Sequence, residues 1–184
     1  MAAKRPKDLS WTVLAVRVPA EPSRHRVAVW RELRRAGALL LGQGVWALPD
    51  TPAFAEALER TLKLVERGDG EVLLLTARGR DPLQAARLEA QFTAARQEEW
   101  LEFISECAKY ESELDREFAQ EKFTPAELDE EEQSLDRLRR WHRELKLRDL
   151  FGAPSNREAD QRLRESQARL EAFSEQVYAT VHQH

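Results

Sequence analysis

The sequence predicts an α+β protein, in which a ferredoxin-like βαββαβ sandwich is followed by a bundle of three long amphipathic helices. Residues 10–78 alternate apolar strands with amphipathic helices in the order of this sandwich. After Asp81-Pro82 the apolar pattern becomes helical and no convincing strand follows. With 34% charged residues and only 7 Gly and 8 Pro in 184 residues, much of the chain should be helix with solvated faces. We therefore expect a domain at 1–80 and a helical bundle at 81–184, or one continuous domain if the long helix grows straight out of the sheet.

The sandwich begins with a strand at 10–18, which is rich in β-branched and apolar residues and ends at Pro19. Ser23 is a plausible N-cap for a helix that ends near Ala36, before a C-terminal glycine at Gly37. Residues at spacings of three predict its buried stripe: Val27, Trp30 and Leu33.

The second half of the sandwich starts with two short strands, 38–41 and 45–48, around the hairpin turn Gly42-Gln43-Gly44. A helix follows from Pro52 to Gly68, and a fourth strand covers 71–77. The inward residues of this helix are predicted to be Phe54, Leu58, Leu62 and Val65.

Three long helices are expected in the rest of the chain. The first covers about 82–120, with an apolar stripe of Phe92, Trp100, Phe103, Cys107, Tyr110, Leu114 and Phe118. A capping box at 124–127 opens the second, which ends at 152–154 and turns inward Leu128, Leu135, Leu138, His142 and Leu145. A capping box at 155–158 opens the third, with an inward stripe of Ala159, Leu163, Ser166, Leu170, Phe173 and Val177.

Charge is distributed unevenly along the chain. The formal net charge is −4, but residues 1–50 carry +5 and residues 51–184 carry −9. Such asymmetry suggests contact with nucleic acid. Residues 17–35 hold six arginines and two acids, and arginine binds phosphate through a planar fork. The predicted phosphate-binding residues here are Arg17, Arg24, Arg26, Arg31, Arg34 and Arg35. Alternatively, this is a solvated helix face, or its arginines pair with acids of the long helices.

A second basic cluster lies at 137–148, which has six Lys/Arg and one acid around Trp141. The segment 94–134 has the opposite character, with four Lys/Arg and fourteen acids. The favoured interpretation is that the acidic and basic helices pair and set their register. Three residues are still candidates for a second phosphate-binding ridge: Arg139, Arg143 and Lys146. The tryptophans are expected to pack in the core and not to stack on bases.

No catalytic residue, cofactor or metal site is predicted. The single cysteine, Cys107, lies on an apolar stripe, where thiols are usually inert. His182 and His184 come at the terminus with no carboxylate cluster at fixed spacing. No phosphate-binding glycine loop, dinucleotide fingerprint or serine elbow is present. The start of the chain lacks the apolar run of a secretory leader, so the expectation is a cytoplasmic protein without a membrane partner.

Several runs make the chain resemble a known family. The motif PAEPSRHRVAVWR at 19–31 is followed by GVWALP at 44–49, and later by FTPAEL at 123–128, LRRW at 138–141 and RDLFGAP at 148–154. These runs resemble the N-terminal domain of the ChrB family, the regulators of bacterial chromate resistance. More distantly, the layout resembles the C-terminal part of the phenylacetate repressor PaaX and the small CRISPR-associated ferredoxin-like nucleases.

The ChrB resemblance implies a chromate-responsive transcriptional regulator, acting as a homodimer on DNA upstream of a chromate-resistance operon. Longer members carry a further chromate-resistance domain, which this chain is not expected to contain. Chromate is a tetrahedral dianion, and the one cluster named for it is Ser23, Arg24 and Arg26.

Two other functions stay open. The nuclease resemblance implies dimerisation through the sheet and a metal-binding acid at the end of the first strand, where this chain has Arg17-Val18-Pro19. A non-catalytic interaction module is the other alternative, with the acidic segment 94–134 docking a basic partner.

Overall fold

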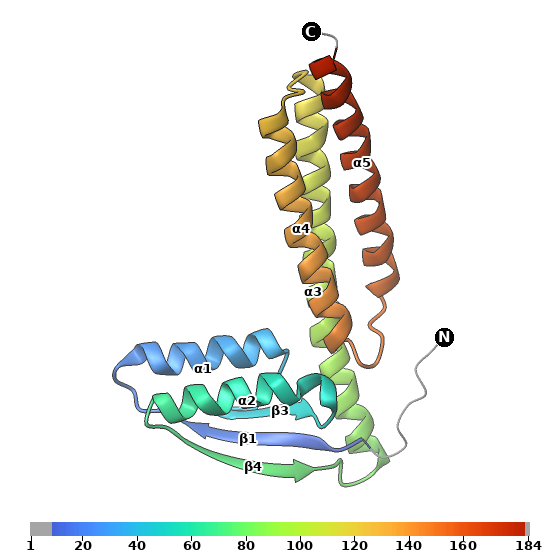
Figure 1. Cartoon of the computed structure of the whole chain (residues 1–184). Coiled ribbons are helices and arrows are strands. Elements are labelled where there is room, and N and C mark those ends of the chain that lie inside the picture. Colours follow the sequence, from blue (N-terminus) through green and yellow to red (C-terminus); the bar gives the residue numbers. More distant parts are fainter. Residues whose placement is uncertain (1–8, 183–184) are drawn as a thin grey trace. The chain divides into compact units, whose positions relative to one another are not determined.

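The computed structural model describes residues 9–182 and has the predicted α+β architecture (Figure 1). The amino-terminal elements are β1 (Trp11–Arg17), α1 (Ser23–Ala36), β2 (Leu39–Gly42), β3 (Val45–Pro49), α2 (Pro52–Arg67) and β4 (Glu71–Ala77). Three long helices follow: α3 (Pro82–Ala119), α4 (Pro125–Arg148) and α5 (Asn156–His182). Residues 1–8, where no leader is predicted, and His184 lie outside the described residues.

The four strands form one antiparallel sheet in the order β2-β3-β1-β4, which confirms the ferredoxin-like sandwich. β1 lies in the middle, with Leu14 opposite Trp46 of β3 on one side and Leu74 of β4 on the other. Helices α1 and α2 cover the same face of this sheet (Figure 1). Thr12 and Leu48 line a hollow with α2 residues, so their face is the one turned toward the helices. The opposite face carries the alternate residues of each strand.

Two compact units make up the chain, one ending at Arg96 and the other beginning at Gln97. The boundary falls inside α3, so the first turns of this helix belong to the sheet unit. Phe92 of α3 packs edge-to-face against Trp11 of β1 and Phe54 of α2, with ring centroids 5.6 and 6.1 Å apart. The sheet unit is therefore completed by a helical segment that the βαββαβ pattern does not include.

The core of the bundle follows the predicted apolar stripes closely. Every residue predicted to face inward on α5 is buried, and so are Trp100, Phe103, Cys107, Tyr110 and Leu114 of α3. Thr124 caps α4 by accepting a hydrogen bond from the backbone N–H of Glu127 at 3.3 Å, as the capping box predicts. On α4, Leu135, Leu138 and Leu145 are buried, and the helix ends at Arg148, before the predicted Gly152.

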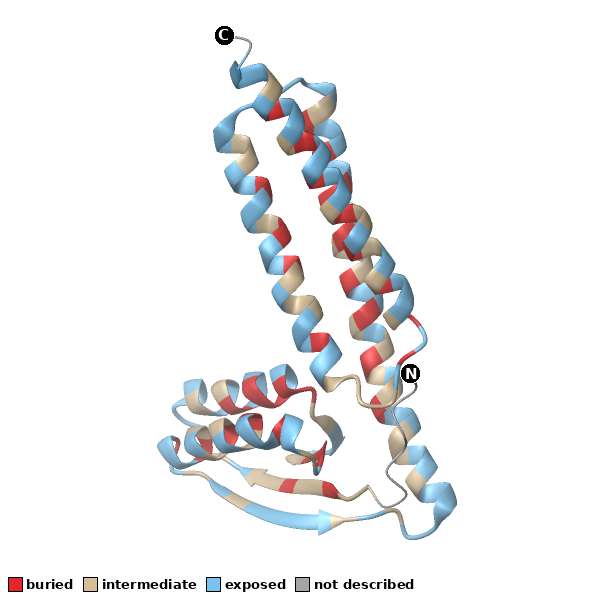
Figure 2. Ribbon diagram, turned by 45° about the vertical axis from the view of Figure 1, so that its right-hand side comes forward, coloured by how far each residue is buried: buried red, intermediate tan, exposed pale blue. Residues whose placement is uncertain are grey.

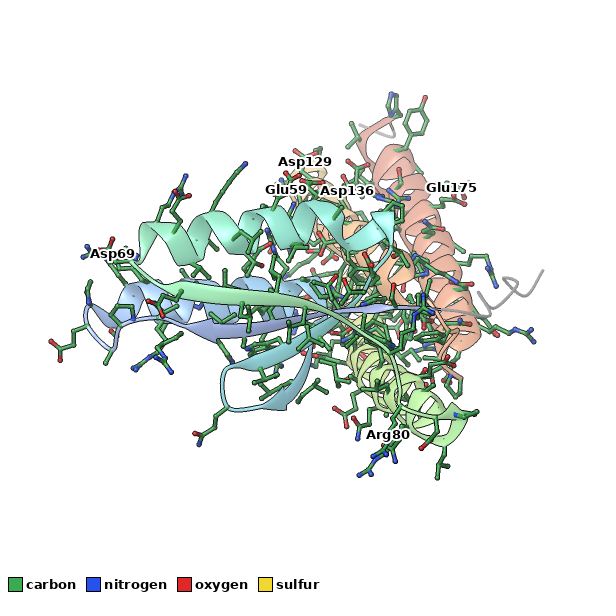
Figure 3. The ribbon with its side chains drawn as sticks, turned by 90° about the horizontal axis from the view of Figure 1, so that it is seen from below. Glu59, Asp69, Arg80, Asp129, Asp136 and Glu175 are labelled. Atoms are coloured by element: carbon green, nitrogen blue, oxygen red, sulfur yellow. The ribbon has the colours of Figure 1, made fainter. Side chains whose placement is uncertain are left out.

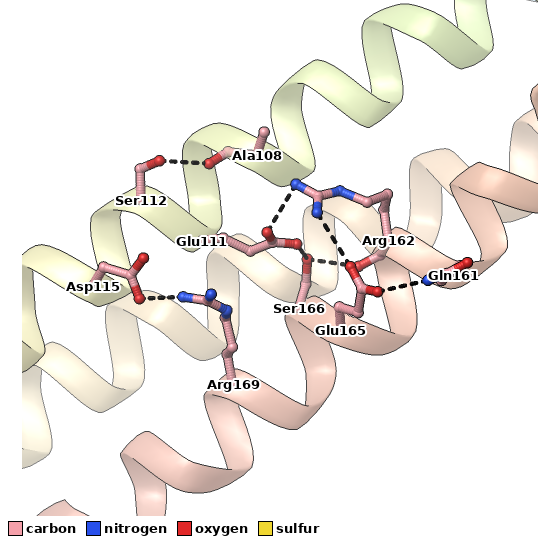
Figure 4. Close-up of polar contacts among 9 residues, drawn as sticks. All are labelled: Ala108, Glu111, Ser112, Asp115, Gln161, Arg162, Glu165, Ser166 and Arg169. Atoms are coloured by element: carbon pink, nitrogen blue, oxygen red, sulfur yellow. Dashed lines mark hydrogen bonds and ion pairs between the residues drawn. The ribbon is translucent and has the colours of Figure 1, made fainter.

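Polar contacts between α3 and α5 fix the pairing of these helices (Figure 4). Arg162 of α5 bonds the buried Glu111 of α3 at 2.9 Å, and Ser166 donates to the same carboxylate at 3.1 Å. Arg169 pairs with Asp115. The acidic side chains of α3 are thus partly neutralised by α5, and not only by the basic segment of α4 as the sequence suggested.

The buried stripe predicted for α1 is wrong at two of its three residues, since only Leu33 is buried as predicted. Val27 and Trp30 are 36% and 49% exposed, whereas Val29, Leu33 and Ala36 are buried. Residues at a constant spacing of three drift around a helix by about 60° each time, so 27, 30 and 33 do not share one face. The true stripe was hidden because it contains a charged residue, the buried Glu32. Ser23 is also the first residue of the helix and not its N-cap, which is Pro22.

On α2, Phe54 and Val65 are buried as predicted, but Leu58 and Leu62 are only half-buried and Ala57 and Thr61 fill the core. Within residues 9–182, none of the helices has both the length and the apolar character needed to cross a bilayer.

Candidate nucleic-acid interface

Helix α1 presents its arginines to solvent. All five side chains predicted on it to bind phosphate, Arg24, Arg26, Arg31, Arg34 and Arg35, are exposed. The helix has no acidic residue in its first turn. Within the described part of the chain, Arg24, Arg26, Arg31 and Arg34 form no ion pair. The solvated-face and anion-binding interpretations both require this exposure.

One acid organises the buried side of α1. The carboxylate of Glu32 accepts from Arg35 of the same helix and from Nε of Arg60 on α2, each at 2.8 Å. The hydrogen bond that Arg60 donates to Glu32 raises the pKa of Arg60 above its usual value. Because both carboxylate oxygens are engaged, Glu32 ties α1 to α2.

An exposed tryptophan, Trp30, joins this surface, although the apolar pattern had predicted it to be buried. The guanidinium carbon of Arg34 lies 5.7 Å from the centroid of the Trp30 ring, a cation–π contact. Val27, also exposed, comes one turn before Arg31. The spacing of Val29, Leu33 and Ala36 could have revealed this, since it defines a buried stripe on the side of the helix away from Trp30.

The carboxyl end of α1 is closed by backbone and side-chain bonds. Gly37 adopts a left-handed conformation (φ 76°) and donates to the carbonyl of Arg34, while Ala38 donates to that of Leu33. The buried Arg96 of α3 donates to the carbonyl of Gly37 at 2.7 Å and lies over the Phe92 ring. These bonds anchor one end of α1 to the sheet unit, so its arginines are carried on a rigid element.

Arg17, Ser23, Arg24 and Arg26 lie near the other end of α1. Arg17 is the exposed last residue of β1, opposite Glu71 in the register, and forms no ion pair among the described residues. Ser23, Arg24 and Arg26 occupy the first turn of the helix, and all three are exposed. Arg24 and Arg26 leave the helix about 200° apart because they are two positions apart. Their backbone positions therefore do not bring the two guanidinium groups together on one side of the helix.

Half of the six Lys/Arg side chains of the second basic cluster, on α4, form ion pairs within the described part of the protein. Arg139 pairs with Asp136 at 3.1 Å, and Lys146 pairs with Asp160 of α5 at 2.8 Å. Arg148 pairs with Glu99 of α3 at 3.2 Å, which is the acidic–basic helix pairing that the sequence favoured. Arg143 is exposed and has no ion pair within residues 9–182. The cluster thus offers fewer unpaired cations than α1.

Asp160 links the basic cluster to α5. Burial acts to raise its pKa, but hydrogen bonds from Lys146 and from His142 lower the pKa below the usual value. His142 Nε2 lies 2.7 Å from the Asp160 carboxylate, and its ring packs against Trp100 and Phe103. This arrangement is a structural clamp between α4 and α5.

Within residues 9–182, neither the cysteine nor the histidines form a reactive cluster. Cys107 is fully buried, and burial raises the pKa of its thiol to about 11, so it is protonated at neutral pH. Among the described residues, no group of three or more His, Cys, Asp or Glu side chains is arranged to hold a metal ion.

From residue 26 onward, the chain matches a known protein family. The family model described as "Protein ChrB, N-terminal" matches residues 26–184. The chain belongs to the ChrB family. A curated relative, Protein ChrB of Cupriavidus metallidurans, is 29% identical over 107 residues, which cover 58% of this chain.

The chain matches only part of that ChrB protein. The aligned region covers 32% of the relative's length, so this chain corresponds to about a third of it. No solved structure gives a significant match. The ChrB match begins at Arg26 and therefore includes most of the arginines of α1, while Arg17 and Arg24 precede it.

Proposed function

We propose that this chain is a DNA-binding part of a transcriptional regulator of the chromate-resistance type, and that the outward surface of α1 contacts the DNA. The observation that carries the proposal is the group of four exposed guanidinium groups on α1 that form no ion pair with any residue in 9–182, beside an exposed tryptophan. Membership of the ChrB family supports the link to chromate resistance. The proposed role is non-catalytic.

The spacing on α1 suits a duplex. Arg24, Val27, Arg31 and Arg34 are separated by three, four and three positions, so they share one side of the helix. From Arg24 to Arg34 the helix rises about 15 Å, which is about four phosphate steps along one DNA strand. An α-helix with its side chains is about 10–12 Å wide and the major groove about 12 Å, so α1 could also reach base edges.

Trp30 adds a contact that phosphate binding alone does not need. Its half-exposed ring can pack on a sugar or on an unstacked base, and the neighbouring Arg34 provides the charge. A surface that combines arginine with tryptophan is typical of interfaces. The anionic partner is favoured because the exposed charges on this side of α1 are cationic.

The ridge on α4 contributes less to this proposal. Lys146 and Arg139 would have to give up their partners Asp160 and Asp136 to bind phosphate. Arg143 is the one residue of the three that could bind without breaking an ion pair among the described residues. We therefore place the main contact on α1.

The salt dependence of binding tests the proposal quantitatively. If the four unpaired arginines of α1 each meet one phosphate, the plot of log affinity against log salt should have a slope of about −3.6. Affinity should then fall about 150-fold between about 50 and 200 mM KCl. Fluorescence anisotropy with a duplex taken from beside the chain's own gene measures this directly.

The variant Arg31→Ala/Arg34→Ala should reduce the slope to about −1.8 and the loss of affinity to about 12-fold over the same range. The matched control is Arg157→Ala/Arg164→Ala, which removes two exposed arginines of α5 and changes the net charge equally. A slope near zero, or equal effects of the two double variants, would refute the α1 interface.

The same titration also tests whether chromate changes DNA binding and whether the protein cleaves DNA. Loss of binding on adding chromate would support an effector role, with Arg24→Ala and Arg26→Ala as the variants to examine. Cleavage of the labelled DNA in Mg²⁺ or Mn²⁺, abolished by a chelator, would replace the regulator proposal with the nuclease alternative.

A further inference from the structure

The outer edge of β4 is unusually open. β4 pairs with β1 along its whole length, from Glu71 opposite Arg17 to Ala77 opposite Trp11. Within residues 9–182, no strand pairs with its other edge. Three consecutive leucines are exposed there: Leu73 at 59%, Leu74 at 40% and Leu75 at 50%. Figure 2 shows β4 as exposed along most of its length.

The opposite edge of the sheet, formed by β2, has features that prevent pairing with another strand. β2 has only four residues, Leu39–Gly42, and its register with β3 shifts between Leu40 and Gly42. Short edge strands and bulges are devices by which proteins prevent edge-to-edge pairing. β4 has neither device, since it is seven residues long, regular, and free of Pro and Lys. The difference between the two edges indicates that β4 pairs with another strand.

A second copy of β4 fits this edge. In an antiparallel pair related by a twofold axis perpendicular to the sheet, residues directly opposite each other must have side chains on the same face. The register that overlaps all seven residues places the axis at Leu74. It puts Leu73 opposite Leu75 of the partner subunit, and Val72 opposite the partner's Thr76. Apolar and β-branched pairs of this kind stabilise antiparallel ladders.

The charges at the two ends of β4 are complementary in this register. Asp69 and Glu71 are at the start of the strand, and Arg78 and Arg80 follow its end. Figure 3 shows Asp69 and Arg80 at opposite ends of β4. An antiparallel pair brings the acidic start of each strand to the basic end of the other, whereas a parallel pair would bring like charges together.

We propose that the protein forms a homodimer through antiparallel pairing of β4 with β4 of a second copy, centred on Leu74, which joins two four-stranded sheets into one of eight strands. This surface is distinct from α1. The proposal does not depend on DNA binding and is tested without DNA.

Disulfide trapping tests the register. Leu74→Cys places identical residues on the twofold axis, within reach of a disulfide across an antiparallel pair. Under mild oxidation this variant should form a covalent dimer at least tenfold faster than Leu40→Cys, its matched control on β2, which is 55% exposed. Leu73→Cys alone should cross-link slowly, but a mixture with Leu75→Cys should give the heterodimer. The native Cys107 is buried and does not compete.

Sedimentation of the full chain gives a second measurement. The wild type should be a dimer, and Leu73→Lys/Leu75→Lys should raise the dimer dissociation constant more than tenfold, because it places like charges on a strand that must pair with itself. Leu40→Lys should leave the dissociation constant unchanged. A monomeric wild type, or a dimer that survives the double lysine substitution, would overturn the proposal. Equal trapping through Leu40→Cys would do the same.

Discussion

Glu131 of α4 is a carboxyl group whose ionisation should work against the fold. Its side chain is only 4% exposed, and Oε2 has no hydrogen-bond partner in the described part of the chain. Burial raises the pKa of Glu131 to about 7, and the neighbouring acids Glu113 and Glu117 add to the effect. We predict that Glu131→Gln stabilises the protein at neutral and alkaline pH, since the amide resembles the protonated acid in shape and carries no charge.

The magnitude follows from linkage between protonation and folding. A carboxyl group with an ordinary pKa of 4.5 when unfolded and a pKa of about 7 when folded binds its proton more tightly in the native state. The destabilisation caused by Glu131 is small at low pH and grows as the pH rises. At pH values above the folded pKa, it levels off at about 3 kcal/mol of unfolding free energy. Between about pH 5 and pH 7 this group alone should lower the free energy of unfolding by about 2 kcal/mol.

Chemical denaturation followed by circular dichroism at several pH values measures this effect. Glu131→Gln should gain about 2–3 kcal/mol at about pH 8 and little at about pH 5, so the gap between variant and wild type should widen with pH. Glu132→Gln is the matched control, because Glu132 is the exposed neighbour on α4 and should change stability by less than about 0.5 kcal/mol. A constant gap across the pH range would refute the assignment of a raised pKa to Glu131.

Three further predictions concern other residues. Asp160→Asn should lower the free energy of unfolding by about 1–3 kcal/mol at neutral pH, because His142 and Lys146 lose a charged acceptor. Since folding lowers the pKa of Asp160, this loss of stability should shrink as the pH falls toward and below that pKa. A loss that stays the same in acid would contradict the prediction. The Cys107 thiol should react with Ellman's reagent at a rate that rises steeply with denaturant, and rapid labelling of the native protein would show that the thiol is not buried. Trp30→Ala should leave the melting temperature within a few degrees of wild type yet weaken DNA binding about tenfold, as measured by anisotropy, whereas a large loss of stability with unchanged binding would return Trp30 to the core.

In the helical bundle, the periodicity of apolar residues was sufficient to predict most of the buried positions. On α5 every predicted inward residue is buried, because 27 residues with a consistent apolar stripe leave one orientation that buries it. The strand order and the antiparallel sheet also follow from the βαββαβ pattern, whose short connections leave few topologies. Thr124 followed by Pro125 and Glu127 was sufficient to locate the start of α4.

The surface of α1 was predicted only in part. Its arginines could be read from the sequence, but the orientation of the helix could not, because Glu32 occupies a buried position that an apolar pattern leaves out. Only the packed structure supplies the reason, which is the ion pair with Arg60 on α2, 28 residues away. That same rotation exposes Trp30.

Local patterns were sufficient to predict the elements, the apolar stripes of the long helices and the concentration of positive charge near the start of the chain. These depend on periodicity and composition, which are properties of neighbouring residues. Among the described residues, packing in three dimensions shows which cations are already neutralised, which tryptophan faces solvent and which strand edge is unpaired. Those features depend on contacts between distant segments, such as Lys146 with Asp160 and β1 with β4, and no local pattern encodes them.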